Sequence, residues 1–149
     1  MKTLLTLEME NRLDNYLTKQ RVFHCNEVTI GWHGKQRVDW MSYDTHGIIK
    51  CFEIKTSKVD FHSKAENTFV GHYNYYVMPK ELYEQVKDDI PKHIGVLVDD
   101  GIIRKAYQRL QSIKPAKELI IHNEEVLKEY LIRSLSREAK KYRKLDKTK

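Results

Sequence analysis

The sequence is poor in glycine, proline and cysteine, and it has no long hydrophobic run. Only 6 Gly and 3 Pro occur among 149 residues, which excludes collagen-like and low-complexity chains. No apolar stretch reaches the roughly 18 residues of a membrane-spanning helix, and Glu8 and Glu10 interrupt the N-terminal apolar residues at once. The two cysteines, Cys25 and Cys51, lie far apart, which favours reduced thiols over a disulfide framework. We therefore expect a cytoplasmic protein without a membrane partner.

The composition is that of one globular domain with an uneven charge distribution. Hydrophobic residues make up 40% and charged residues 32% of the 149 residues, enough apolar material for a self-sufficient core. The formal net charge is +6, and residues 137–149 carry +5 of it, because they hold seven Lys and Arg against two acidic residues. We divide the chain into a domain over residues 1–136 and a basic C-terminal tail over 137–149. Phosphate binding and the solubility of a helix end both explain such a tail.

The spacing of apolar residues predicts helices that alternate with strands. Helices are predicted over residues 3–19, 57–67 and 80–89 and from Asn123 onward. Strands are predicted over 22–32, 37–43, 48–55, 73–78, 94–98 and 102–107, the last one reached through a hairpin turn at Asp99-Asp100-Gly101. This order predicts a single α/β domain with a mixed central sheet flanked by helices.

The most informative segment is the predicted hairpin between the second and third strands. Its loop, residues 45–47, ends in a glycine, as a three-residue hairpin loop requires. With this loop Tyr43 faces Ile49 and Asp39 faces Glu53, so that the two carboxylates have Cβ atoms roughly 4.5–5.5 Å apart. Lys55 shares the face of Glu53, because side chains alternate along a strand.

Two facing carboxylates repel each other and need a compensating charge. Lys55 supplies part of it, but a divalent cation compensates better. Mg²⁺ binds through one or two carboxylates together with waters and phosphate oxygens. Such a metal activates water and neutralises charge at a phosphoryl group, and Lys55 can then orient the attacking water. The structural alternative is a solvent-exposed charge triad across two strands.

The motif and its surroundings resemble a known family. Arg37-Val38-Asp39, then Glu53-Ile54-Lys55, then residues 72–79 (HYNYYVMP) are similar to the PD-(D/E)XK nuclease superfamily, whose αβββαβ core has the element order predicted for residues 3–78. Within it, residues 8–103 resemble the MmcB-like branch of DNA-repair nucleases and small phage-encoded relatives. Val38 departs from the family, which nominally has Pro before the aspartate.

This resemblance implies a restriction-endonuclease-like fold and a Mg²⁺-dependent nuclease, with Mn²⁺ as a substitute metal. It implies hydrolysis of phosphodiester bonds in DNA, in repair, recombination or phage DNA processing, in the cytoplasm of a bacterial or phage-infected cell. Asp39, Glu53 and the backbone carbonyl of Ile54 would hold the metal, and Lys55 would position the water. Glu10 matches an acidic residue on the first helix of many members, where it holds a metal-bound water.

Basic residues near the motif are candidates for binding DNA phosphates, with plain solubility as the alternative. They are Lys35, Arg37, Lys58 and Lys64. Three other functions stay open at this point. They are a nuclease-like protein that binds DNA without cutting it, a protein-interaction module whose basic tail is incidental, and a branched-DNA resolvase that acts as a homodimer. The histidines and cysteines show no spacing typical of a zinc site.

Overall fold

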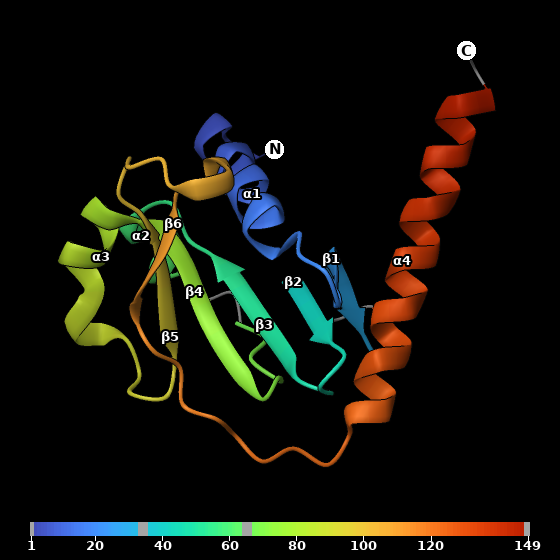
Figure 1. Ribbon diagram of the computed structural model, residues 1–149. Coiled ribbons are helices and arrows are strands. Elements are labelled where there is room, and N and C mark those ends of the chain that lie inside the picture. Colours follow the sequence, from blue (N-terminus) through green and yellow to red (C-terminus); the bar gives the residue numbers. More distant parts are fainter. Residues whose placement is uncertain (1, 33–35, 64–66, 148–149) are drawn as a thin grey trace.

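A computed structural model describes residues 2–32, 36–63 and 67–147. The described residues form one sheet of six strands with helices on both faces (Figure 1). In chain order the elements are α1 (Leu4–Leu17), β1 (Val22–Ile30), β2 (Gln36–Asp44), β3 (Ile49–Ile54), α2 (Lys58–Phe61), β4 (Tyr73–Pro79), α3 (Lys80–Val86), η1 (Lys87–Asp89), β5 (Gly95–Asp99), η2 (Lys105–Tyr107), β6 (Leu110–Lys114) and α4 (Glu124–Lys147).

The strands lie side by side in the order in which they occur in the chain. The pairs β3–β4 and β4–β5 are parallel, and the other neighbouring pairs are antiparallel. The mixed sheet and the αβββαβ order of the first elements confirm the predicted fold class. No described helix has the length and apolar character needed to cross a membrane.

Helix α1 covers one face of the sheet, here called the α1 face. Thr3 begins the helix, because its hydroxyl accepts a hydrogen bond from the N–H of Thr6 at 3.2 Å. Met9, Leu13 and Leu17 recur at helical spacing and are buried against the sheet. They pack on side chains from β2 to β6, namely Trp40, Phe52, Ile54, Val77, Leu97 and Leu110.

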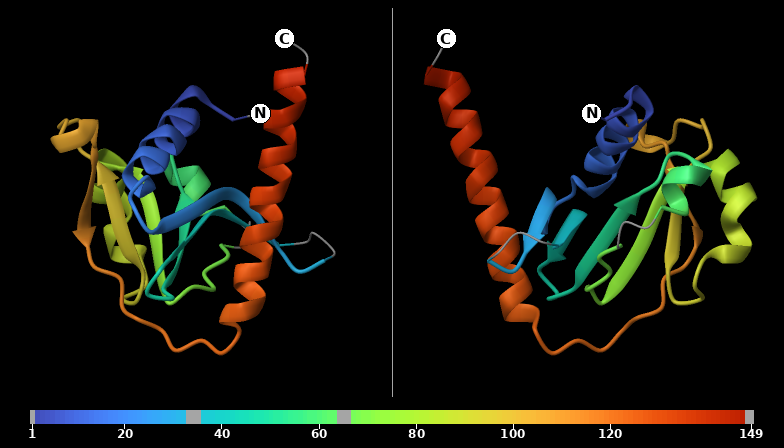
Figure 2. Two further views of the ribbon diagram at one scale, coloured as in Figure 1. Left: turned by 45° about the vertical axis from the view of Figure 1, so that its right-hand side comes forward. Right: turned by 180° about the vertical axis from the view of Figure 1, so that it is seen from behind.

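The opposite face, here called the α3/α4 face, is covered by two helices at its two ends (Figure 2). Helix α3 packs through Leu82 and Val86 over β4 and β5, and α4 packs through Leu127 and Leu131 over β1. Strand alternation therefore turns the odd-numbered residues of β3 away from α1. This face carries the segment around Glu53, between the areas that the two helices cover.

Two arginines of α4 bind the main chain of the edge strand β1. Arg137 donates from Nη1 to the carbonyl oxygen of Glu27 at 2.8 Å and from Nη2 to that of Asn26 at 2.9 Å. Arg133 donates to the carbonyl of Thr29 at 3.2 Å. The arginines thus occupy carbonyl oxygens of β1 that could otherwise accept hydrogen bonds from a strand of another chain. Beyond residue 138 the helix is exposed and projects past the sheet (Figures 1 and 2).

Two predictions of secondary structure were wrong. The segment 102–107 is not a strand: Ile102 and Ile103 are exposed, and Arg104 binds Asp100 Oδ2 at 2.6 Å within a longer turn. The last strand begins only at Leu110, because the side chains of Asp99 and Asp100 bond within the turn in place of a tight hairpin.

The predicted helix over 57–67 is also wrong in length, since α2 ends at Phe61. Ser57 caps it as expected, with its hydroxyl accepting from the N–H of Asp60 at 3.1 Å. The chain then leaves the helix to bring the main chain of Thr68 to the side chain of Glu53. Likewise, the last turn of the predicted helix 80–89 is the 3₁₀ turn η1.

We expect Arg137 to hold α4 on the sheet. Arg137→Ala removes two hydrogen bonds to carbonyl oxygens and should lower the free energy of unfolding by about 1–3 kcal/mol. The matched control is Lys140→Ala, which removes the same charge from an exposed position one turn later and should change it by less than about 0.5 kcal/mol. Urea denaturation measures both, and equal effects of the two substitutions would contradict the assigned role.

Candidate metal centre on the α3/α4 face

The turn between β2 and β3 sets the register of the hairpin. Asp44 Oδ1 accepts hydrogen bonds from the N–H groups of His46 at 2.9 Å and Ile48 at 3.2 Å. Gly47 has a φ of 84°, the left-handed conformation that this turn requires. The paired residues run from Tyr43 with Ile49 to Trp40 with Phe52, which confirms the predicted register.

Asp39 and Glu53 stand one position beyond the last of these pairs, and main-chain amides hold both carboxyl groups. Asp39 Oδ2 accepts a hydrogen bond from the N–H of Ile54 at 2.9 Å. This side-chain bond continues the contact between β2 and β3 beyond their last main-chain pair, Trp40 with Phe52. Glu53 Oε1 accepts from the N–H of Thr68 at 2.9 Å. The two carboxyl groups are also within hydrogen-bonding reach of each other. The structure therefore brings together the two acids that the sequence predicted to face each other.

Burial and the neighbouring acid change the protonation of Glu53. Its side chain is only 4% exposed. Burial first, and then the negative charge of Asp39, raise the pKa of Glu53 to about 9, although the Thr68 N–H and Lys55 act in the opposite direction. At neutral pH Glu53 therefore holds a proton, which it shares in a hydrogen bond with Asp39.

Lys55 lies beside this pair and is 6% exposed. Its N–H donates to the carbonyl oxygen of Val77 at 3.0 Å, which extends the pairing of β3 with β4 to the lysine. Its ammonium group lies 3.5 Å from the carbonyl oxygen of Asp60 in α2. Asp60 is itself fixed, since its Oδ2 accepts from the N–H of Thr56 at 3.1 Å. The short helix α2 thus positions the lysine next to the acids.

Two residues near the site escaped the sequence analysis. Thr68 contributes only a main-chain N–H, which no sequence pattern marks. Tyr76 is paired with Glu53 across the parallel strands β3 and β4, and its hydroxyl accepts from Asn67 Nδ2 at 3.0 Å. Burial, and to a lesser extent Glu53, raise the pKa of Tyr76. Tyr76 lies next to Glu53 because of the register between β3 and β4. The β2–β3 hairpin turn does not determine that register, so the sequence did not predict it.

Glu10 belongs to an ion-pair cluster at the start of the chain. It lies on α1, where its Oε1 is 2.5 Å from the ammonium group of Lys2, which also lies 3.0 Å from Glu27 Oε1. Within the described parts of the chain, no group of three or more His, Cys, Asp or Glu side chains is arranged to hold a metal ion. The structure thus places Glu10 in an ion-pair cluster, and its role in holding a metal-bound water stays a prediction.

The predicted basic residues fall into two groups. Arg37 is 60% exposed on β2 and lies 3.9 Å from Glu27 Oε2, and Lys58 is exposed at the first residue of α2, three positions after Lys55. Lys35 and Lys64 lie outside the described residues. Two of the four basic residues are therefore located, and both flank the motif in the sequence.

The donor set fits a hard divalent cation. Each carboxyl group has one oxygen held by a main-chain N–H, and its second oxygen has no main-chain partner among the described residues. Carboxylate oxygens are the ligands that Mg²⁺ prefers, and a cation here would replace the proton as the group that offsets the repulsion. Asp39 and Glu53 would hold it. Ile54, whose carbonyl the resemblance adds, ends β3 directly after Glu53.

Comparisons with known proteins give a likeness of fold and no family. No family model and no curated protein matches the sequence. A solved structure does match: the SPO1766 protein of unknown function from Silicibacter pomeroyi, with a TM-score of 0.74 and 18% sequence identity, over 98% of this chain and 96% of that chain. At this identity the match supports the single-domain α/β fold alone.

The proton on Glu53 predicts how stability depends on pH. The unfolded glutamate ionises near pH 4.5, whereas folded Glu53 ionises near pH 9, so the folded state binds more protons between these values and stability falls as pH rises. Glu53→Gln keeps the shape, an acceptor for Thr68 and a donor for Asp39, and it cannot ionise. Without metal it should be more stable than the parent at pH 8 by up to about 5 kcal/mol, at about 1.4 kcal/mol per pH unit above 4.5, and equal near pH 4.

Thermal and urea unfolding in the presence of EDTA, at steps between pH 4 and pH 9, measure this difference. A stability difference that does not grow with pH would contradict a protonated Glu53.

Proposed function

We propose that this protein is a Mg²⁺-dependent nuclease that hydrolyses phosphodiester bonds in DNA. One observation carries the proposal: the buried Lys55 lies beside the buried Glu53 and the half-buried Asp39, and hydrogen bonds to the main chain hold all three residues where the pairing of β2 with β3 stops. A structural charge triad would be exposed to solvent, where it costs little. The burial of Glu53 beside a second acid has a cost that metal binding explains.

The residues divide the chemistry among them. A cation bound by Asp39 and Glu53 supplies Lewis acidity toward a phosphate oxygen and lowers the pKa of a coordinated water. Lys55 holds the attacking water in line with the phosphorus through its ammonium group, which the carbonyl of Asp60 orients. It also offsets the negative charge that grows on the phosphate oxygens as the bond breaks.

The distribution of basic residues supports a nucleic acid as the partner. Residues 137–147 of α4 hold six Lys and Arg against two acidic residues, and from residue 139 onward they are exposed. Phosphate contacts from such a helix end release counterions and strengthen binding without sequence preference. With the resemblance to DNA-repair and phage nucleases, this favours a role in DNA repair, recombination or phage DNA processing.

The first prediction for this function is that metal binding releases the proton of Glu53 and therefore depends on pH. Because the cation must displace the proton of Glu53, the affinity for Mn²⁺ should rise about tenfold per pH unit below the pKa of Glu53, with one proton released per ion bound. Isothermal titration calorimetry in buffers of different ionisation enthalpy measures both quantities. Glu53→Gln should lose this binding, and the exposed control Glu118→Gln should keep it. Binding that is independent of pH would contradict the assigned ligand.

The second prediction is cleavage itself. Labelled single-stranded, duplex and four-way-junction DNA should be cut in Mg²⁺ or Mn²⁺ and not in EDTA. Asp39→Asn, Glu53→Gln and Lys55→Gln should each reduce the rate by at least about 100-fold, because each removes a group that acts in the transition state.

Lys92→Gln, which removes a charge from an exposed position, is the matched control and should leave the rate unchanged. Cleavage that survives Glu53→Gln would place the activity in a contaminant or another site. Salt-sensitive binding without cleavage by any metal would favour a DNA-binding protein that does not cut.

A further inference from the structure

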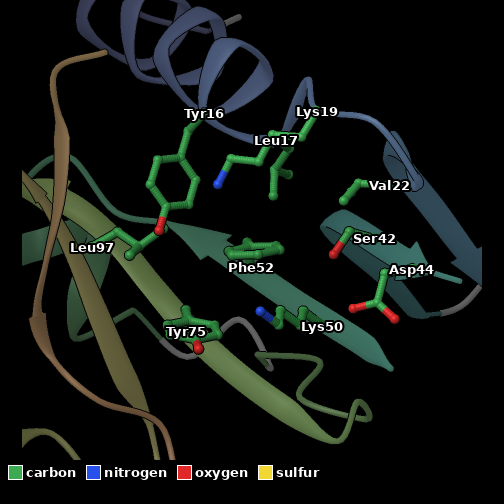
Figure 3. Close-up of a pocket in the computed structure, with 10 residues that line it drawn as sticks. All are labelled: Tyr16, Leu17, Lys19, Val22, Ser42, Asp44, Lys50, Phe52, Tyr75 and Leu97. Carbon is green, nitrogen blue, oxygen red and sulfur yellow. The ribbon is translucent and has the colours of Figure 1, made fainter. Parts of the chain in front are cut away.

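A second site lies on the α1 face of the sheet, below the C-terminal end of α1. It is a pocket of about 90 Å³ between the last turn of α1 and the strands β2, β3 and β4 (Figure 3). Lys50 and Phe52 contribute to it from β3, and their even positions turn them away from Glu53 and Lys55. The pocket and the candidate metal centre are therefore on opposite faces of one strand.

The pocket wall holds a hydroxyl that no described protein group binds. Ser42 is only 4% exposed as a residue, but its hydroxyl is reached by solvent through the pocket, and no hydrogen bond from a described residue ends on it. Figure 3 shows this hydroxyl directed into the pocket. The hydroxyl is therefore free to bond to a polar atom of a molecule in the pocket.

Two lysines reach the same space. Lys19 follows α1, with its ammonium 4.5 Å from the centre of the Tyr16 ring, and Lys50 has its ammonium 5.8 Å from the centre of the Tyr73 ring. Among the described residues, neither ammonium group pairs with a carboxylate. The pocket thus has two positive charges that are not neutralised by the protein around them.

Two tyrosine hydroxyls complete the set of donors. Tyr16 and Tyr75 line the pocket, and neither hydroxyl has a hydrogen-bond partner in the described part of the chain. Burial raises the pKa of both groups, so they remain hydroxyls and can donate at neutral pH. With Ser42 and the two lysines, they give the pocket wall five groups able to donate a hydrogen bond.

Two groups near the pocket would repel an anion, namely the Asp44 carboxylate and the carbonyl end of α1. Hydrogen bonds within the protein reduce the negative charge of each. Asp44 is the acidic group on the wall, but its Oδ1 already accepts two hydrogen bonds from the turn. The carbonyl end of α1 is also near, but the hydroxyl of Thr18 donates to the carbonyl of Asp14 at 2.7 Å and its N–H does so at 3.0 Å. Two ammonium groups outnumber one carboxylate, so the balance favours an anion.

We propose that this pocket binds a phosphate group, held by Lys19, Lys50 and the hydroxyl of Ser42, with Tyr16 and Tyr75 as further donors. The size agrees, because 90 Å³ is the space of about three water molecules, which suits a tetrahedral oxyanion and is too little for a nucleobase. Lysine acts as a point charge toward phosphate and needs no planar partner. The phosphate is either free or the terminal phosphate of a nucleic-acid strand.

The test is an NMR titration of the full chain in EDTA with inorganic phosphate, followed through the amide signals of β2 and β3. We expect saturable shifts at Ser42 and Lys50. Lys50→Gln and Ser42→Ala should each weaken binding, the former about tenfold because it removes a charged donor. Asp44→Asn keeps the turn acceptor, removes the repulsion, and should tighten binding severalfold.

A 5′-phosphorylated trinucleotide and its 5′-hydroxyl counterpart distinguish the two sources. Tighter binding of the phosphorylated strand than of inorganic phosphate identifies a strand end, and equal binding identifies free phosphate.

The absence of shifts with phosphate, or shifts that Lys50→Gln and Asp44→Asn leave unchanged, would overturn the proposal. Circular dichroism of each variant shows that it is folded. Glu53→Gln should leave the phosphate titration unaltered while it removes metal binding, so failure at one site is distinguishable from failure at the other.

Discussion

The close approach of the half-buried Asp39 carboxyl group to the buried Glu53 carboxyl group is the interaction on which the candidate site depends. Burial of Glu53 next to Asp39 disfavours a second negative charge at neutral pH, so a proton or a cation offsets the repulsion. Main-chain N–H groups of Ile54 and Thr68 hold one oxygen of each acid. These bonds keep the two acids close together despite their repulsion, and in the proposed function a metal ion would offset it.

Strand alternation lets one strand serve two sites. On β3, Glu53 faces the helices α3 and α4, whereas Lys50 and Phe52 face α1. The acidic centre on one face and the pocket with Lys19 and Lys50 on the other have opposite charge character, although only a few residues separate them in the sequence. The strand thus separates the proposed cation site from the proposed anion site, because their side chains point to opposite faces of the sheet.

The sequence predicted the parts of the site that depend on neighbouring residues along the chain. The loop ending in Gly47 and the period of two together place Asp39 opposite Glu53, with Lys55 on the same side. The same local reasoning failed for residues 102–107, where side-chain bonds of Asp99 and Asp100 override a hydrophobic pattern. It also could not place Glu10, because a helix position says nothing about which distant cation, here Lys2, will take the carboxylate.

By itself, the sequence determined the hairpin register, the order of helices and strands and the basic character of α4, because turn chemistry, side-chain periodicity and charge are local properties. Only the tertiary structure decided that Glu53 is buried, that Thr68 binds it, and that Ser42 opens into a pocket beneath α1. These features arise where segments far apart in the chain exclude water from one another, and the loss of water is what shifts a pKa and leaves a hydroxyl without a partner.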